Sequence, residues 1–168
     1  MTDFDVGMQT RREVLGDEHV DRAAANAGEF GAPWQEFITR YAWGDIWSRP
    51  GLSRAERSLV TLAVLAAMQH EHELAMHVRA ALRNGLTPEQ IREVLLQVAV
   101  YTGVPVANRA FPVAQRALTE ARAEDDARDA GPAFGDQSFQ AAGVPVDPPA
   151  PGCSPAQTGT PAPSGRPP

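Results

Sequence analysis

The stretch 53-SRAERSLVTLAVLAAM-68 places a helix start directly before a long apolar run. Ser53 and Glu56 match the S-x-x-E pattern of a capping box, in which each side chain bonds the backbone N–H of the other residue. After Ser58 the run is apolar nearly all round, which is typical of a helix buried on every side. We therefore expect a helix through about Met68 that is central in a helical domain or shared with another subunit.

The rest of the trunk carries similar helix signals and no alternating strand pattern. Asn84-Gly85 is a typical helix stop, and Thr87 with Gln90 is a second helix start that has proline in its first turn. Gly103 and Pro105 mark another boundary. The sequence therefore predicts an all-α protein, with helices at 17–27, 33–47, 53–68, 70–84, from 87 to about 103 and at 106–122, the first two being separated by 28-GEFGAP-33.

The last part of the chain has a different composition. From Gly131 onward, 38 residues include ten of the fifteen prolines and six glycines, with few side chains that a core could bury. Such a composition is typical of disorder. We predict a helical domain at 1–122 and a disordered tail at 123–168. A domain of this size has a small core, which favours a homo-oligomer.

Composition also excludes several classes of function. The net charge of −6 provides no basic face for a nucleic acid. No apolar run is long enough to span a membrane and no signal peptide opens the chain, so we expect a cytoplasmic protein. Cys153 is the single cysteine, which excludes an internal disulfide or a CxxC pair, and the absence of lysine excludes Schiff-base chemistry.

Three of the four histidines lie in 70-HEHELAMH-77. On a helix turning about 100° per residue, His70, Glu73 and His77 share one edge beside the apolar face, whereas His72 faces the opposite side. We expect His72 to be solvated. A glutamate and a histidine on adjacent turns at the border of a core can hold a proton near neutral pH, or can form an ion pair that only stabilises the helix.

A metal site is disfavoured by the spacing. A helical zinc protease motif is H-E-x-x-H, but His72-Glu73 is followed by Met76 where the second histidine should lie. His70 and His77 are two turns apart, too far to chelate one ion comfortably. We expect no metal.

The stretch 52–111 resembles the carboxymuconolactone decarboxylase family, whose all-α fold is shared with alkylhydroperoxidase D. The resemblance rests on the combination of ERSLVTLA, EL-x-x-H-V-R-A, NG-x-T-x-E-x-I-R-E-V-L and Y-x-G-V-P over roughly 60 residues. It extends more weakly to 11-RREVLGDEHVDRA-23, which is similar to the start of the 4-carboxymuconolactone decarboxylases.

The family has a thiol peroxidase branch and a decarboxylase branch. Aligning the peroxidase histidine on His77 places the two peroxidase cysteines on His70 and Glu73, and its relay glutamate near Ser58. None of these is a thiol, so peroxidase activity is excluded. The remaining resemblance implies cofactor-free decarboxylation of 4-carboxymuconolactone, a lactone dicarboxylate of protocatechuate catabolism (the β-ketoadipate pathway), by a trimer or hexamer.

The resemblance and this chemistry suggest roles for particular side chains. His77 is the first candidate for the proton or oxyanion donor, and Glu73 either orients His77 or delivers a proton itself. Candidate substrate-binding residues are Arg57, Ser58, His19, Arg22, His70 and Tyr101; Arg79 is set aside because it faces away on the helix. Two alternatives stay open: a non-catalytic helical oligomer that binds an anionic small molecule or a protein, and a related cofactor-free lactone lyase or isomerase.

Overall fold

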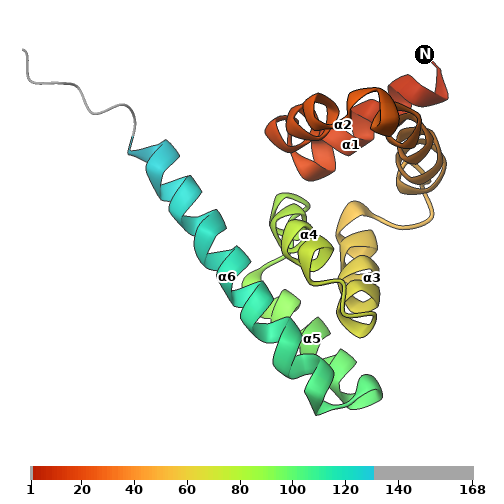
Figure 1. Cartoon of the computed structure of the whole chain (residues 1–168). Coiled ribbons are helices and arrows are strands. Elements are labelled where there is room, and N and C mark those ends of the chain that lie inside the picture. Colours follow the sequence, from red (N-terminus) through yellow and green to blue (C-terminus); the bar gives the residue numbers. More distant parts are fainter. Residues whose placement is uncertain (1, 131–168) are drawn as a thin grey trace, which may run out of the picture. The chain divides into compact units, whose positions relative to one another are not determined.

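The computed structural model describes residues 2–130, and every regular element within that range is a helix (Figure 1). The prediction of an all-α protein is confirmed for these residues. The elements in chain order are α1 (Asp3–Leu15), α2 (Asp17–Ile38), the π-helix η1 (Thr39–Trp47), α3 (Arg54–Ala67), α4 (Glu71–Arg83), α5 (Pro88–Thr102) and α6 (Val104–Asp129).

Several ends of the helices α3 to α6 lie at signals that the sequence carries. Ser53 caps α3 in a complete capping box with Glu56, and Thr87 caps α5 in the same way with Gln90. Between α4 and α5 the chain turns through Gly85, whose φ of 91° favours glycine. The four helices predicted in this part are therefore confirmed as elements, although α6 ends at Asp129, beyond the predicted 122.

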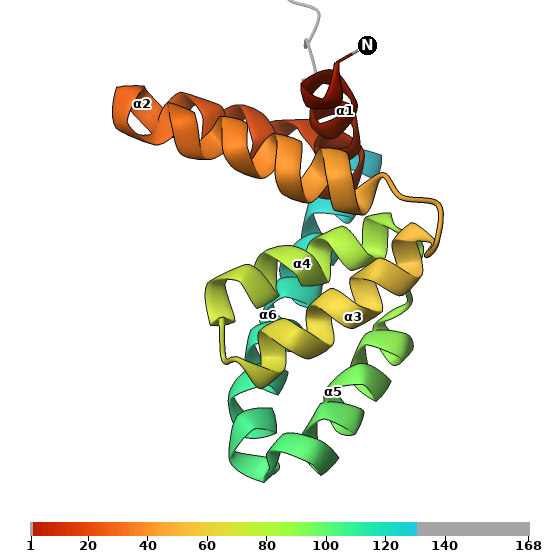
Figure 2. The ribbon, with the colours of Figure 1, turned by 90° about the vertical axis from the view of Figure 1, so that its right-hand side faces the viewer.

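These four helices share one hydrophobic core. Helix α3 packs against α4 and α5, and α6 packs against α4 and α5 (Figure 2). The most buried side chains at the centre of this core are Leu62, Leu74, Val78, Ile91 and Leu95.

Helix α3 is not buried on every side, which corrects the first expectation from its sequence. Val60 is 56% exposed, Val64 48% and Met68 61%, so one apolar face of α3 has no partner among the described residues. The apolar positions all round α3 therefore exceed what the core of one chain can cover. The other expectation, that this helix is shared with a second subunit, stays a prediction.

The part from α1 to η1 is less regular. Helix α1 was not expected, although Thr2 and Asp5 form a capping box at its start. The predicted break after residue 27 is confirmed, but it is limited to Gly28, where φ is 55° and ψ is −170°. The helix resumes at once, and Pro33 lies inside it, where it leaves the carbonyl of residue 29 without its helical N–H partner. From Thr39 the hydrogen bonding changes to the π pattern.

Close backbone contact joins α1 to η1. A Cβ atom at Gly7 would overlap the Thr39 carbonyl oxygen, and one at Gly44 would lie 2.8 Å from the Asp3 carbonyl oxygen. Both glycines therefore allow the two helices to approach at a distance that other residues would prevent. A second hydrophobic cluster forms beside this contact, from Val14, Leu15, Val20 and Trp43 together with Ala80 of α4.

The last helix continues further than expected, because residues 123–129, assigned to the tail, belong to α6. The remainder of the predicted tail, with Cys153, lies outside the described residues. None of the helices that the structure describes has the length and apolar character needed to cross a membrane.

Candidate active site

Helix α4 lies between the two hydrophobic clusters and carries His77. Leu74, Val78 and Ala81 face the first cluster, whereas Ala80 faces the second. His77 lies among these buried residues and is only 9% exposed. The spacing had placed His77 at the edge of the apolar face, and the structure places it inside.

The ring of His77 stacks on Trp47, with ring centroids 6.1 Å apart and an angle of 23° between the planes. Trp47 in turn packs on Trp43, one turn earlier in η1, at 5.2 Å. The buried Trp43 anchors this pair in the second cluster. The π-helix thus holds the indole of Trp47 against one face of the imidazole of His77.

His77 is held in its neutral form. Its pKa is lowered to about 4, chiefly because burial disfavours the charged ring and also because His19 lies nearby, while Glu73 opposes the shift. Its Nδ1 atom is buried and has no hydrogen-bond partner among residues 2–130. At neutral pH the ring therefore carries a single N–H, which it can donate from one nitrogen only.

Glu73 is exposed on the first turn of α4. No hydrogen bond or ion pair joins it to His77 within the described part of the chain, so its influence on the ring is through charge. His72 is exposed, as the spacing predicts, and His70 is exposed at the position that precedes α4.

A recess of about 630 Å³ opens next to this region, between the start of α2, α4 and the end of α6. Its walls hold two histidines, four arginines and three carboxylates (Asp17, Glu18 and Glu124), together with Met76, the chain neighbour of His77. The basic residues are His19, Arg22, His72, Arg79, Arg83 and Arg128. The recess thus unites two predicted anion-binding residues, His19 and Arg22, with Arg79, which the helical wheel had set aside.

The arginines of the recess differ in their pairing. Three of them bond carboxylates, in the pairs Arg22–Glu18, Arg79–Glu120 and Arg128–Asp125. Arg83 instead donates from Nη1 to the Leu15 carbonyl oxygen at 2.9 Å and pairs with no carboxylate of residues 2–130. Arg83 is therefore the cation best placed to take a ligand carboxylate.

His19 connects the recess to His77. It is half-buried, and its pKa is lowered by burial and then by the charges of Arg11, Arg22, Arg83 and His72. His19 is close enough to His77 to contribute to the low pKa of that ring. A ligand in the recess that carries negative charge would therefore act on both histidines.

The remaining predicted site residues lie elsewhere. Ser58 is buried and accepts a hydrogen bond of 2.9 Å from Asn84 Nδ2, and Arg57 donates to the Arg49 carbonyl oxygen at 2.9 Å. Tyr101 is 79% exposed on α5 and lines an apolar groove between α3 and α5. None of the three lines the recess, and neither do His77, Glu73 and His70; of the predicted site residues only His19 and Arg22 do.

Sequence reasoning missed Trp47 and Arg83. The spacing of Trp43 and Trp47 was a usable signal, since residues four apart in a helix share a face. The contact of Trp47 with His77 was not readable, because it joins elements far apart in the chain. Arg83 was not singled out, because it lies on the side of its helix away from the apolar face, which α2 and α6 in fact border.

Known proteins match most of the described chain. The model of the Carboxymuconolactone decarboxylase family matches residues 32–116. A 4-carboxymuconolactone decarboxylase of Acinetobacter baylyi is 46% identical over 114 residues, which are 68% of this chain and 85% of the relative. Nitrosuccinic acid decarboxylase npaB of Metarhizium robertsii is 44% identical over 117 residues, 70% of this chain and 82% of the relative. A 4-carboxymuconolactone decarboxylase of Pseudomonas putida is 55% identical over 42 residues, 25% of this chain and 88% of the relative.

Proposed function

The chain belongs to the carboxymuconolactone decarboxylase family, and we propose that it converts 4-carboxymuconolactone to the 3-oxoadipate enol-lactone and CO2 without a cofactor. The chain is a carboxy-lyase, like the named decarboxylases that it matches over most of their lengths. The choice of substrate is the proposal, because a relative of nearly equal identity is named for a different acid. Similarity to two 4-carboxymuconolactone decarboxylases favours the lactone.

The reaction needs a hydrogen-bond donor more than a strong acid. The departing carboxylate is conjugated through a C=C bond to the lactone carbonyl, so loss of CO2 moves electrons onto that carbonyl oxygen as a dienolate, and a proton taken up from solvent then adds to a ring carbon to give the enol-lactone. A donor aimed at this oxygen stabilises the transition state more than the ground state. In a buried site such a donor also acts with little screening by water.

The observation that carries the proposal is the buried, neutral His77 stacked on Trp47. A ring with a pKa of about 4 is uncharged at pH 7, so it is poorly suited to deliver a proton as an imidazolium. It can still donate its one N–H to the dienolate oxygen. We therefore assign His77 the oxyanion role, and Glu73 a positioning role through its charge.

The recess supplies the cation that a dianionic substrate requires. Arg83, whose guanidinium lacks a carboxylate partner in residues 2–130, is proposed to hold the side-chain acetate, with His19 and Arg22 beside it. The departing carboxylate must stay away from these cations, because pairing would stabilise it against leaving. Met76 offers the apolar contact on the side of the recess next to His77.

We also propose that the protein acts as a homo-oligomer, a trimer or a hexamer. Two exposed apolar surfaces support this: the α3–α5 groove, and a stripe of stacked aromatic rings at Trp34, Phe37 and Tyr41, each more than half exposed. Large exposed apolar patches mark interaction sites. Sedimentation of the full chain tests the assembly, and a monomer at micromolar concentration would contradict it.

The test of function is turnover by the purified full chain, followed as CO2 release and enol-lactone formation from 4-carboxymuconolactone. Wild-type protein should turn over. His77→Ala should lose about a hundredfold or more in kcat, the usual effect of removing one oxyanion donor. His77→Gln, which keeps an N–H, should recover part of the loss.

His70→Ala is the matched control, because His70 is exposed and lies outside the recess. It should keep nearly wild-type turnover. Absence of CO2 release by the wild type would refute this substrate, in favour of another lactone or acid. Undiminished turnover by His77→Ala would remove His77 from the mechanism and leave the substrate standing.

A further inference from the structure

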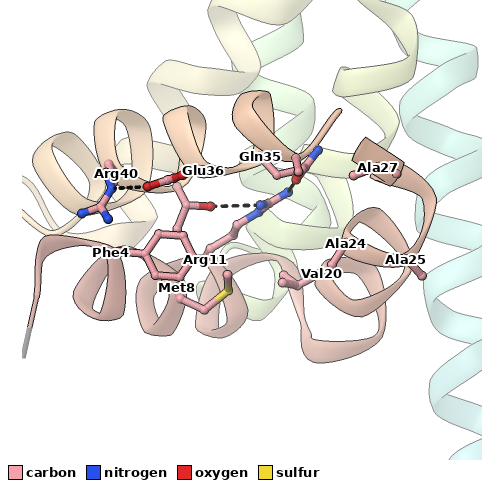
Figure 3. A pocket seen from close by; sticks show the side chains of 13 residues that line it. Phe4, Met8, Arg11, Val20, Ala24, Ala25, Ala27, Gln35, Glu36 and Arg40 are labelled. Atoms are coloured by element: carbon pink, nitrogen blue, oxygen red, sulfur yellow. Dashed lines mark hydrogen bonds and ion pairs between the residues drawn. The ribbon is translucent and has the colours of Figure 1, made fainter. Parts of the chain in front are cut away.

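A second cavity, also of about 630 Å³, lies within the part formed by α1, α2 and η1 and shares no lining residue with the recess (Figure 3). Arg11 lies at its floor and is only 5% exposed. Nothing in the proposed decarboxylation uses this arginine. A buried guanidinium that faces a cavity therefore needs a separate explanation.

The cavity exists because α2 folds back on itself. At Gly28 the backbone adopts φ 55° and ψ −170°, a combination that is accessible essentially only to glycine. The helix before this point carries Val20, Ala24 and Ala25 along one wall, and the helix after it carries Gln35 and Glu36 along the other (Figure 3). Gly28 thus opens a space between two halves of one helix.

Arg11 reaches into this space with its hydrogen-bonding capacity only partly used. Nη1 donates to Thr39 Oγ1 at 3.2 Å and Nη2 donates to Gln35 Oε1 at 2.8 Å, and both acceptors are neutral. The Nε atom is buried without a partner. A guanidinium has five N–H donors, so several remain for a ligand.

No carboxylate among residues 2–130 neutralises Arg11. Glu36, the nearby acidic residue of the cavity, is paired with Arg40 at 3.1 Å. Burial without a compensating anion lowers the pKa of the Arg11 guanidinium. Buried charges are ordinarily paired, because leaving water without a counter-charge is costly. The uncompensated cation therefore marks the place of a missing anion.

The other walls indicate what that anion is attached to. Phe4, Met8, Val20 and a group of alanines give the cavity an apolar lining around the single buried cation. Arg40, the other cation of the lining, is exposed and already paired with Glu36, so a multiply charged ligand such as a phosphate would find no second unpaired cation there among the described residues. A carboxylate matches the fork of a guanidinium and adds only one charge.

We propose that the Arg11 cavity binds a small monocarboxylate with an apolar body, at a site separate from the recess where decarboxylation is proposed. The carboxylate bonds the open N–H groups of Arg11, and the apolar body packs on Met8, Val20 and Ala24. Val20 lines the cavity and its chain neighbour His19 lines the recess, so the two sites meet in α2 and the charge of Arg11 acts on His19. A bound carboxylate offsets that charge.

The test uses the full chain and benzoate as the probe, with benzamide as an uncharged molecule of the same shape. Isothermal titration should show benzoate binding and at least tenfold weaker binding of benzamide, since one charge-assisted pair is lost. Arg11→Met should weaken benzoate binding by roughly tenfold to a hundredfold, and Arg11→Lys less.

Three further variants keep the result interpretable. Ala24→Leu should block the cavity without removing a buried polar group, so it tests the site even if Arg11→Met fails to fold. Arg12→Met removes the adjacent arginine, which pairs outside the cavity with Asp17 and Asp21, and should leave benzoate binding unchanged. Arg83→Met should also leave it unchanged, because Arg83 belongs to the recess.

A second readout is the NMR signal of the His19 ring, which should titrate at a higher pH when benzoate is bound. The proposal is overturned if benzoate does not bind, if benzamide binds equally well, or if Arg83→Met abolishes binding while Ala24→Leu does not. In those cases the role of Arg11 is structural: it joins α1 to Gln35 and Thr39 through hydrogen bonds. None of these outcomes depends on decarboxylase activity.

Discussion

The two parts of the molecule are built differently. From Ser53 to Asp129, four regular helices with well-defined caps enclose one hydrophobic core. From Thr2 to Trp47, the chain contains a break at Gly28, a π-helix, and glycine contacts that bring backbones together. Both parts bury polar side chains, Ser58 and His77 in the regular part and Thr10, Arg11 and Thr39 in the irregular part, but within residues 2–130 only the irregular part buries an arginine.

This difference indicates where the functional side chains lie in the fold. The regular part fixes the backbone of His77, and the irregular part brings Trp47 against its ring and His19 near enough to act on it through charge. The irregular part also opens the Arg11 cavity. Departures from regular structure cost stability and tend to persist at functional sites. The regular helices thus act as a support for functional groups contributed by the other part.

The largest effect on stability is expected in the regular part. Leu74 is 1% exposed at the centre of its core, so Leu74→Ala should lower the free energy of unfolding by about 3 to 5 kcal/mol. Leu52→Ala, at a 43% exposed leucine before α3, is the control and should cost less than about 1 kcal/mol. Urea denaturation followed by circular dichroism measures both. Equal losses would contradict the placement of Leu74 at the centre of the core that supports the regular part.

Acid should destabilise the protein through His77, at the junction of the two parts. The folded pKa of about 4 lies below the ordinary value of 6.5, so between these values the unfolded chain binds a proton that the folded chain does not. Stability should therefore fall as the pH drops from 6.5 to 4, by at most about 3 kcal/mol. Urea midpoints across this range measure the fall.

His77→Gln should remove this part of the pH dependence, and His70→Gln, at an exposed histidine, should keep it. If the urea midpoint of His77→Gln fell with pH as steeply as that of the wild type, other groups would be responsible for the loss of stability.

A smaller effect is expected at the break in α2. Gly28→Ala places a side chain at φ 55° and should cost about 2 kcal/mol, even though space is open around that position. Gly51→Ala is the matched control, because it has equally open space and no positive φ, and should change stability by less than about 1 kcal/mol. Faster amide exchange confined to α1 and α2 in Gly28→Ala is the expected signature, and exchange equal to that of Gly51→Ala would contradict it.

The smallest effect compares the first caps of the two parts. Ser53→Ala should cost about 1 kcal/mol, because the capping box of α3 holds an end of the central core. Thr2→Ala removes an equivalent box from α1 but should cost less than about half as much, since terminal turns fray. Thermal unfolding of the two variants under matched conditions measures both losses of stability. A larger loss for Thr2→Ala than for Ser53→Ala would contradict this expectation.

Most of the regular part could be predicted from the sequence, because its helix ends depend on local chemistry. Each of these helix ends is marked by residues that lie within a few positions of it: Ser53 with Glu56, Asn84-Gly85, and Thr87 with Gln90. The π-helix could not be predicted in this way. An apolar pattern indicates a helix, but the shift in hydrogen-bond register depends on packing against α1.

The site was predictable only where it depends on a single helix. Spacing alone placed His77 beside the core and His72 in solvent. Ser58 was expected near His77, but its hydroxyl is turned toward Asn84. Arg11 was not singled out because an arginine is ordinarily exposed, and its burial follows from contacts with residues more than twenty positions later in the chain.

The central claim is that His77 acts as a neutral hydrogen-bond donor. The most direct test is NMR titration of its ring in the full-length wild-type protein, with His77→Gln used to assign the signal. The account predicts a midpoint near pH 4, with the ring uncharged from pH 5.5 to 8. A midpoint at or above 6.5 would contradict it, because His77 would then be available as a cationic acid at working pH.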